Sequence, residues 1–178
     1  MFMRTRIRER NEMKNSFEVR GDLVAIFLNR RDGSVLEAII DRADLERAKA
    51  FRLKWGPQWC PKTKSFYVVG QRNTVFIHRW LTSCPEGLEV DHINHDTLDN
   101  TRKNLRIVSC LENKQNLKGN SRNKSGFRGV HWNKACRKWR VQVAVNGKNI
   151  DFGLFDSLER AAEVAHQARV KLMPCYVS

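Results

Sequence analysis

The stretch that decides the fold is residues 88–116, which read LEVDHINHDTLDNTRKNLRIVSCLENKQN. An apolar run ends in Asp91 and His92, and a polar loop follows it. The chain then returns through residues 104–108, which are strand-like. The pattern therefore predicts a strand, a loop and a second strand that pairs antiparallel with the first.

A helix is predicted directly after the second strand. Ser109 places a hydroxyl at the expected cap, and Glu112 places a carboxylate three residues later, which is the pattern of a capping box. Asn113 then falls on the first turn of this helix. We expect the helix to lay the Asn113 amide over the two-stranded hairpin.

The predicted fold brings together the side chains of Asp91, His92 and Asn113. Carboxylate and amide oxygens are hard ligands that suit Mg²⁺ with several waters retained. An imidazole can take a proton from water near neutral pH. A hard cation beside a base is the minimum needed to cut a phosphodiester, because the metal stabilises charge on the phosphate while the base activates the nucleophile.

With Asn104 thirteen residues after Asp91 and Asn113 nine further on, the stretch resembles the HNH (ββα-metal) endonucleases of the phage homing type, in the HNN variant. The resemblance covers about residues 76–116. It implies that His92 is the general base and that Asp91 and Asn113 hold one metal ion. It also implies that Asn104 braces the loop by side chain to backbone hydrogen bonds and so orients His92. Asn113 in place of His favours Mg²⁺ or Mn²⁺ over Zn²⁺.

Other polar residues of the region have simpler interpretations. An isolated Asp-His pair is more often a turn than a site, so the hypothesis depends on the full set of residues. We interpret His95 as a solvated loop residue rather than a second base, and Asp96 and Asp99 as turn residues that offer acceptors to the loop backbone. His78 is expected to brace the hairpin and is left out of the catalytic set.

The charge of the chain points to a polyanionic partner. The 178 residues include 33 Lys and Arg against 19 Asp and Glu, a formal net charge of +14. Neutralising phosphates releases counterions, so this excess suits a nucleic acid, and together with the resemblance it predicts double-stranded DNA as the partner. Charge alone would equally suit RNA. A membrane partner is not expected, because we find neither a long apolar face nor an apolar run long enough to span a bilayer.

The five cysteines are odd in number, widely spaced and without a C-x-x-C pair. This argues against a zinc knuckle and against a disulfide framework. We interpret them as reduced thiols of a cytoplasmic protein, in the host cytoplasm or nucleoid if the protein is phage-encoded. No small-molecule cofactor beyond the metal is expected, and the protein is predicted to act as a monomer or dimer on DNA.

The N-terminal part, residues 16–70, is predicted to be a small β-rich module that supports the site. Strand-like segments at 17–20, 23–28 and 34–40 are separated by Gly21-Asp22 and by a hairpin turn at Asp32-Gly33. Asp41 is expected to cap a short helix over residues 42–51. The aromatic residues of the module are expected to pack in its core rather than to stack on bases.

A polar, cationic linker over residues 118–126 is predicted to separate two domains. It follows a flexible basic leader, residues 1–15, and a domain of residues 16–117 that joins the β-rich module to the nuclease hairpin and helix. The domain after it spans 127–178. From Lys118 to Ile150 the chain has nine Lys or Arg and no Asp or Glu. Such a run is often only a solvated face, but here it lies on patterned strands.

The last domain is predicted to be a three-stranded antiparallel sheet packed on one helix, so the fold class is α+β. Residues 138–145 alternate strictly, with Trp139 and three valines on one face, and Asn146-Gly147 is a hairpin turn. The returning strand is expected to turn Ile150, Phe152 and Leu154 inward. Asp156 is expected to cap a helix whose buried stripe is Leu158, Ala161, Ala165, Ala168 and Leu172.

With Phe127-Arg-Gly-Val130, Lys138-Trp139, Phe152-Gly-Leu-Phe155 and Glu159-Arg-Ala-Ala162, this domain resembles the Apetala and ethylene-response-factor DNA-binding domain. That family lays its sheet in the major groove. A plant target sequence does not carry over, because His131 stands where plant members usually have Arg. The alternative is a sheet that only packs on the nuclease. The resemblance and the basic run together predict DNA contacts by Lys124, Arg128, Trp132, Arg137, Arg140 and Lys148.

The sequence therefore predicts a metal-dependent DNA endonuclease, of the homing or phage type, that hydrolyses a phosphodiester. A single site per chain favours nicking of one strand. The alternative is a non-catalytic, sequence-specific DNA-binding protein with an inactive nuclease module.

Overall fold

The computed structural model describes residues 13–51, 53–70, 74–116 and 123–176. The chain divides into two compact units, Met1–Ile107 and Val108–Ser178. Most of the predicted leader and residues 118–122 of the predicted linker lie outside the described residues. The predicted domain limits at residues 16, 117 and 127 stay predictions.

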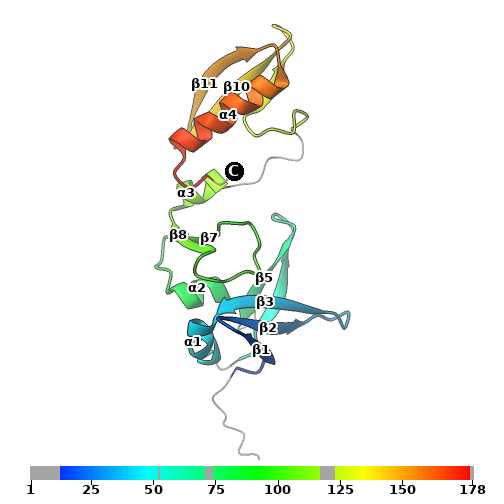
Figure 1. The fold of residues 1–178 in the computed structure, drawn as a ribbon, viewed down its shortest axis with the longest axis vertical. Helices are drawn as coiled ribbons and strands as arrows, with labels where there is room; N and C mark the ends of the chain where they lie inside the picture. Colours follow the sequence, from blue (N-terminus) through cyan, green and yellow to red (C-terminus); the bar gives the residue numbers. More distant parts are fainter. Residues whose placement is uncertain (1–12, 52, 71–73, 117–122, 177–178) are drawn as a thin grey trace, which may run out of the picture. The chain divides into compact units, whose positions relative to one another are not determined.

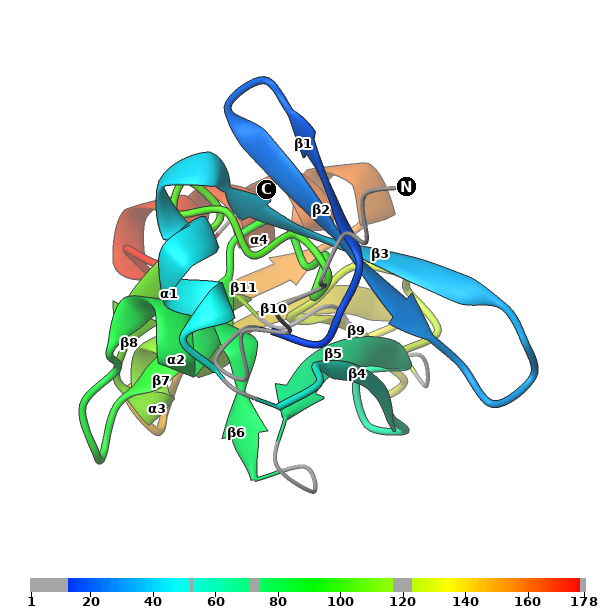
Figure 2. The same ribbon diagram turned by 90° about the horizontal axis from the view of Figure 1, so that it is seen from below.

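The described residues of the first unit form two three-stranded sheets, a two-stranded sheet and two short helices. One sheet has the order β1-β2-β3 and another the order β4-β5-β6, and β7 pairs with β8. Helices α1 and α2 lie beside each other, as Figure 2 shows. The elements of this unit are β1 (Phe17–Arg20), β2 (Leu23–Asn29), β3 (Val35–Asp41), the 3-10 turn η1 (Arg42–Asp44), α1 (Leu45–Lys49), β4 (Gly56–Cys60), β5 (Ser65–Gly70), β6 (Val75–Phe76), α2 (Ile77–Thr82), β7 (Glu89–His92) and β8 (Leu105–Val108), whose last residue begins the second unit.

One hydrophobic core joins the two larger sheets to the helices. Alternation along β2 buries Val24, Ile26 and Leu28, and these pack with Trp55 and with Ile77 of α2. Trp55 is fully buried, and its indole Nε1 donates to the Ala48 carbonyl (3.3 Å). Packing is thus the role of this central aromatic residue, as the sequence predicted, whereas Trp59 on β4 is 49% exposed.

The second unit is a three-stranded antiparallel sheet with one long helix, so the predicted α+β class is confirmed. The strand order is β11-β10-β9, and α4 packs across the sheet, as Figure 1 shows. The predicted stripe of small residues holds, because Ala161 and Ala165 are fully buried against Val130 and Val141. The elements are α3 (Cys110–Asn113), the 3-10 turn η3 (Lys114–Asn116), β9 (Val130–Asn133), β10 (Lys138–Val145), β11 (Lys148–Phe155) and α4 (Leu158–Leu172).

Two predicted details of this unit are wrong. A β-bulge shifts the register, so that Val141 pairs with Gly153 while Gln142 pairs with Asp151. The extra residue reverses the alternation beyond it, so Leu154 is 41% exposed and Phe155 packs in the core in its place. The helix cap is Ser157 rather than Asp156, because the Ser157 hydroxyl accepts from the Arg160 backbone N–H.

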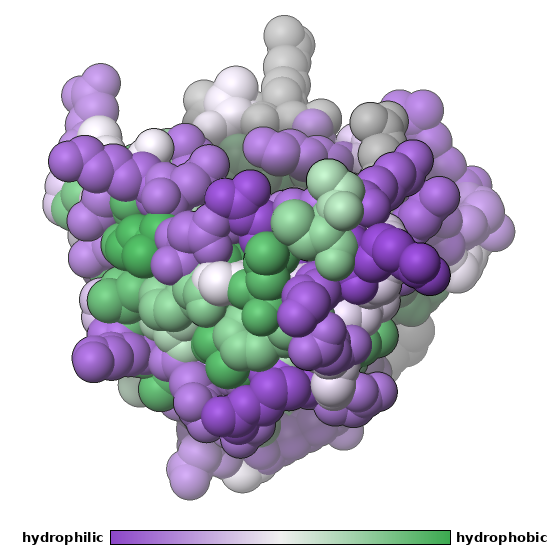
Figure 3. Space-filling model, turned by 90° about the horizontal axis from the view of Figure 1, so that it is seen from above, coloured by the Kyte–Doolittle hydropathy of each residue, from purple (hydrophilic) through white to green (hydrophobic). Residues whose placement is uncertain are grey.

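On the face drawn in Figure 3, hydrophilic side chains surround a central group of apolar ones. All five cysteines are free, as expected. No helix in the described part of the chain is long and apolar enough to cross a bilayer.

Candidate nuclease site

Asp91 and His92 end β7 as the sequence predicted, and both are buried. The predicted capping box is confirmed, because Ser109 Oγ accepts from the Glu112 backbone N–H (3.2 Å) and the Glu112 carboxylate accepts from Ser109 N–H (2.7 Å). Asn113 is the last residue of α3. It belongs to the second unit, whereas Asp91 belongs to the first, so their sharing of one metal ion stays a prediction.

Asn104 holds the loop between β7 and β8 by the type of hydrogen bond that the sequence predicted. Its side-chain oxygen accepts from the Asn94 backbone N–H (2.9 Å), and its amide nitrogen donates to the carbonyls of Asp99 (2.7 Å) and Asp96 (3.4 Å). Asn104 is 4% exposed, so these bonds are shielded from water. The two ends of the loop are thereby fixed relative to His92.

Asp96 and Asp99 are turn residues, as predicted. The Asp96 carboxylate accepts from the Leu98 backbone N–H (3.0 Å), and the Asp99 carboxylate accepts from the backbone N–H (3.1 Å) and hydroxyl (2.7 Å) of Thr101. These side chains satisfy loop backbone groups that no strand partner reaches.

The β-rich part of the first unit supports the same loop. Ile39 of β3 exchanges backbone hydrogen bonds with it, accepting from Asn100 N–H (2.7 Å) and donating to the Leu98 carbonyl (2.8 Å). On the other side, the Thr97 hydroxyl donates to the Phe66 carbonyl of β5 (2.6 Å). A loop of this length would otherwise be mobile, so these contacts explain how it can hold a site.

Arg102 ties the end of the loop to the first helical turn. Its backbone N–H donates to the Asp41 carboxylate (2.6 Å), and its guanidinium donates twice to Asp44 (2.9 and 2.6 Å). Asp41 does stand at the N-cap of η1, but its side chain makes no cap hydrogen bond. The predicted capping by Asp41 is therefore wrong, because the loop takes its carboxylate.

The His92 imidazole is oriented by a residue that sequence reasoning missed. Its Nε2 lies 3.3 Å from the Asn100 side-chain oxygen, and the Asn100 amide nitrogen donates to the Leu98 carbonyl (3.0 Å). That second bond fixes which end of the amide faces the ring. Asn100 is fully buried, yet in a loop rich in Asn and Asp no pattern marks it out.

Burial sets the protonation state of His92. It lowers the pKa of the imidazole, opposed by the Asn100 hydrogen bond and by the charges of Asp91 and Asp96. The His78 ring meets the His92 ring edge to face, with centroids 5.1 Å apart, and burial lowers the pKa of His78 to about 3. Both rings are therefore neutral near pH 7, and a neutral imidazole is the form that accepts a proton.

Asp91 is paired with Arg106, which the sequence analysis also missed. The Arg106 guanidinium donates to one Asp91 oxygen from both Nε and Nη2. The Asp91 side chain is 8% exposed and that of Arg106 is 22% exposed, so the pair is largely shielded from water. The Asp91 carboxylate is therefore already stabilised by one positive charge, that of the Arg106 guanidinium.

The predicted DNA-contacting residues lie on different parts of the second unit. Arg140 pairs with His131 and Leu154 across the sheet and lies on the face opposite the core. Trp132 pairs with Trp139 and so lies on the core side, although it is 46% exposed. The others stand outside the strands or at a strand end: Lys124, Arg128 and Arg137 in loops and Lys148 at the start of β11.

Two of these arginines already have partners within the unit. The Arg128 guanidinium donates to the carbonyls of Gln115 (2.6 Å) and Lys114 (2.9 Å). The Arg140 guanidinium is bound to the Asp151 carboxylate, with Nε at 2.8 Å. Contact with a phosphate would require Arg140 to share or leave this partner.

The segment that carries Asp91, His92, Asn104 and Asn113 matches a known protein family. Residues 82–115 match the model of the HNH endonuclease family, so the chain carries an HNH endonuclease domain. It is also 32% identical to Protein 3.8 of Escherichia phage T7 over 106 residues, which are 60% of this chain and 88% of that protein. The chain therefore belongs to the family of Protein 3.8.

A second relative is the uncharacterized HNH endonuclease L560 of Acanthamoeba polyphaga mimivirus. It is 34% identical over 80 residues, which are 45% of this chain and 40% of that protein. No solved structure matches the chain. The HNH family implies a nuclease with a nucleic-acid substrate and a divalent metal ion.

Proposed function

We propose that the protein is a metal-dependent DNA endonuclease that nicks one strand of a duplex, with His92 as its general base. The observation that carries the proposal is that β7 ends in a buried carboxylate, Asp91, followed directly by a buried, neutral imidazole, His92, within an HNH domain. A neutral imidazole beside a carboxylate provides both a proton acceptor and a hard oxygen ligand.

His92 acts on the attacking water. The tautomer in which Nε2–H donates to Asn100 makes Nδ1 the proton acceptor of the ring. His92 removes a proton from water, and the resulting hydroxide attacks the phosphorus in line. The bond from phosphorus to the 3′ oxygen breaks, the 3′ oxygen takes up a proton from solvent, and the phosphate stays on the 5′ side of the cut. Asn100 orients the ring directly. Asn104 acts indirectly, because it holds the loop that carries Asn100.

Asp91 and Asn113 would hold one Mg²⁺ or Mn²⁺ ion. Their carboxylate and amide oxygens fit a hard cation, and the ion pair with Arg106 supports the view that positive charge is tolerated beside Asp91. In the described part of the chain no group of three or more His, Cys, Asp or Glu gathers. The Asn113 amide and water would share the coordination with Asp91. When bound, the ion stabilises charge on the phosphate and the leaving oxygen.

The second unit would grip the duplex with the basic face of its sheet. Arg140 on β10 and Lys148 on β11, with Lys124, Arg128 and Arg137 in the loops, supply positive charge for backbone phosphates. Trp132 would add a contact from the strand edge. A homing or phage role is consistent with the phage and viral relatives.

A plasmid assay tests the proposal. Supercoiled DNA should be nicked with Mg²⁺ and stay intact with EDTA, and His92→Ala should abolish nicking while duplex binding is retained. His95→Asn is the matched control, because it removes a histidine of the same loop and Asn tolerates the positive φ at that position. Nicking at the wild-type rate by His92→Ala would refute the assignment of His92 as the general base. Duplex binding without nicking by the wild type in Mg²⁺ or Mn²⁺ would favour the non-catalytic alternative.

A further inference from the structure

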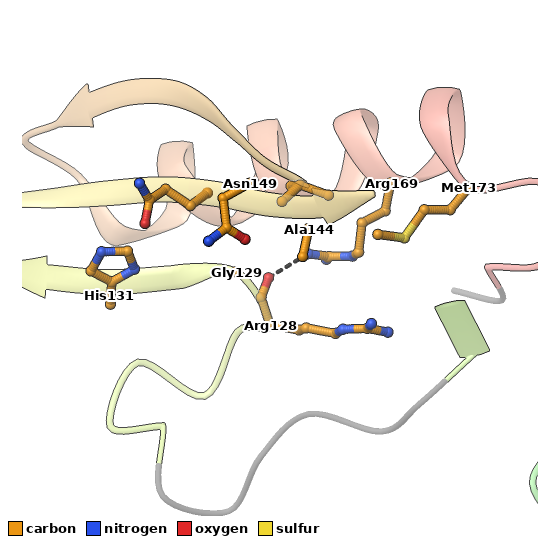
Figure 4. Close-up of a pocket in the computed structure, with 9 residues that line it drawn as sticks. Arg128, Gly129, His131, Ala144, Asn149, Arg169 and Met173 are labelled. Atoms are coloured by element: carbon orange, nitrogen blue, oxygen red, sulfur yellow. Dashed lines mark hydrogen bonds between the residues drawn. The ribbon is translucent and has the colours of Figure 1, made fainter. Parts of the chain in front are cut away.

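A pocket opens in the second unit where the sheet is incomplete. It has a volume of about 260 Å³, and its polar lining includes Arg128, His131, Gln142, Asn149 and Arg169. Figure 4 shows His131 and Asn149 on one side of the pocket and Arg169 reaching toward Gly129 from α4. No carboxylate is among the lining residues.

The pocket exists because β9 is shorter than β10. The last paired residues are Val130 and Val141, and one further hydrogen bond joins Gln142 N–H to the Gly129 carbonyl (2.8 Å). Beyond it, residues 143–145 of β10 have no strand partner on the β9 side in the described part of the chain. Gly129 has a φ of +82°, and a Cβ there would lie 2.7 Å from the Gln142 carbonyl oxygen, so only glycine lets the chain approach this closely.

Arg169 carries an unsatisfied donor in this pocket. The residue is 6% exposed, its Nη1 donates to the Arg128 carbonyl, and its guanidinium lies 4.9 Å from the Tyr176 ring centroid. Its Nε is buried with no hydrogen-bond partner. Within the described residues this guanidinium has no acidic partner, and a buried guanidinium in that state is costly because no anion repays its desolvation.

A second guanidinium adds to the positive charge. Arg128 is half-buried, and burial and the charge of Arg169 both lower the pKa of its guanidinium. Its guanidinium donates to the backbone carbonyls of Gln115 and Lys114. Two neighbouring cations and no lining carboxylate favour an anion in the space between them.

We propose that this pocket binds a phosphate group. Arg169 and Arg128 supply the charge, and the side chains of His131, Gln142 and Asn149 supply neutral donors at the rim. His131 pairs with Arg140 across the sheet, so the rim continues the basic face assigned to DNA. The phosphate comes from a DNA backbone or from free phosphate. The proposal that the phosphate belongs to a DNA backbone rests on the proposed function, whereas binding of free phosphate does not.

Thermal unfolding of the full chain in inorganic phosphate tests the pocket. The unfolding midpoint should rise more in phosphate than in chloride at equal ionic strength, because a ligand bound to the native state stabilises it. Arg169→Lys should lose most of this phosphate-specific rise, since the guanidinium fork is lost while the charge is kept. Arg160→Lys is the matched control, because it makes the same change on an exposed turn of the same helix.

His131→Ala should also reduce the phosphate-specific rise in unfolding midpoint. His131 is exposed, so this variant can be measured even if Arg169→Lys does not fold. Equal rises in phosphate and chloride would overturn the proposal. A full phosphate-specific rise in every folded variant would also overturn it. The readout does not depend on cleavage, so the pocket and the proposed nuclease activity can fail separately.

Salt titration of duplex binding identifies the source of the phosphate. If a backbone phosphate fills the pocket, Arg169→Lys and His131→Ala should each reduce the slope of log affinity against log salt, by up to about one for a fully lost contact. If the variants lose the phosphate-specific rise but keep the wild-type slope, the pocket is a site for free phosphate.

Discussion

Arg106 Nε and Nη2 both donate to the same oxygen of Asp91, at 2.8 and 2.6 Å. The guanidinium therefore provides the countercharge of the carboxylate that we propose as a metal ligand. A divalent cation and Arg106 would both be attracted to this buried negative charge. The pair thus links the stability of the domain to metal binding.

Arg106→Gln should destabilise the protein because it leaves the buried Asp91 carboxylate without its cation. The cost should fall below the roughly 3–5 kcal/mol typical of breaking a buried pair, because Arg106 is itself partly exposed. Added Mg²⁺ should narrow the difference in unfolding midpoint between variant and wild type, since the ion supplies the missing charge.

Arg102→Gln is the control for this comparison. Arg102 makes a similar two-bond contact with the buried Asp44, which is not one of the proposed metal ligands. Mg²⁺ should leave the difference in unfolding midpoint between Arg102→Gln and the wild type unchanged. If Mg²⁺ shifts the Arg106 variant and the wild type equally, Asp91 does not hold the ion.

Asn104→Ala should loosen the loop between β7 and β8. Three backbone groups of the loop lose their buried partner, so the free energy of unfolding should fall by about 1–3 kcal/mol and nicking should fall with it. Denaturant titration and the plasmid assay measure the two effects. Asn94→Ala, which removes an exposed amide of the same loop, should cost less in both assays, and equal losses would argue against a special role for Asn104.

His78→Phe should flatten the dependence of stability on pH. The pKa of His78 is lowered from 6.5 to about 3 in the folded protein, so the unfolded chain binds the proton more readily. The stability tied to neutral His78 is therefore complete above pH 6.5 and is lost as the pH falls toward 3.

Denaturant titrations across this pH window measure the effect. The variant should lose less stability than the wild type on acidification, while a slope should remain because burial also lowers the pKa of His92. His131→Phe, at an exposed position, should behave like the wild type. An unchanged slope in His78→Phe would mean that His78 is not held neutral by burial.

Asp151→Asn should strengthen duplex binding by releasing Arg140. The Asp151 carboxylate is exposed, and its pKa is lowered by the hydrogen bond from Arg140. The gain in affinity should be small, at most about fivefold, because exposed ion pairs are weak. Fluorescence anisotropy with a labelled duplex measures it.

Glu163→Gln removes the same charge from an ion pair on α4 and serves as the control. If it strengthens binding as much as Asp151→Asn, the gain reflects net charge alone and not the release of Arg140.

The sequence by itself determined many of the elements and their chemistry, although it did not predict the sheet β4-β5-β6 or helix α2. Period-two patterning and turn residues located the strands around Asp32-Gly33 and Asn146-Gly147, and the capping box at Ser109 and Glu112 located the start of α3. These features are local, since each depends on residues a few positions apart. The family match at residues 82–115 likewise rests on local spacing.

Only the tertiary structure decided which side chains meet. Asn100 reaches His92, Arg106 neutralises Asp91, and Asp41 bonds the loop instead of its own helix, because long-range packing sets these distances. The bulge opposite Val141 and the burial of Arg169 were likewise decided by how strands and helix fit together. Local sequence patterns do not predict such contacts, because the energy of a buried polar group depends on partners that are distant in the chain.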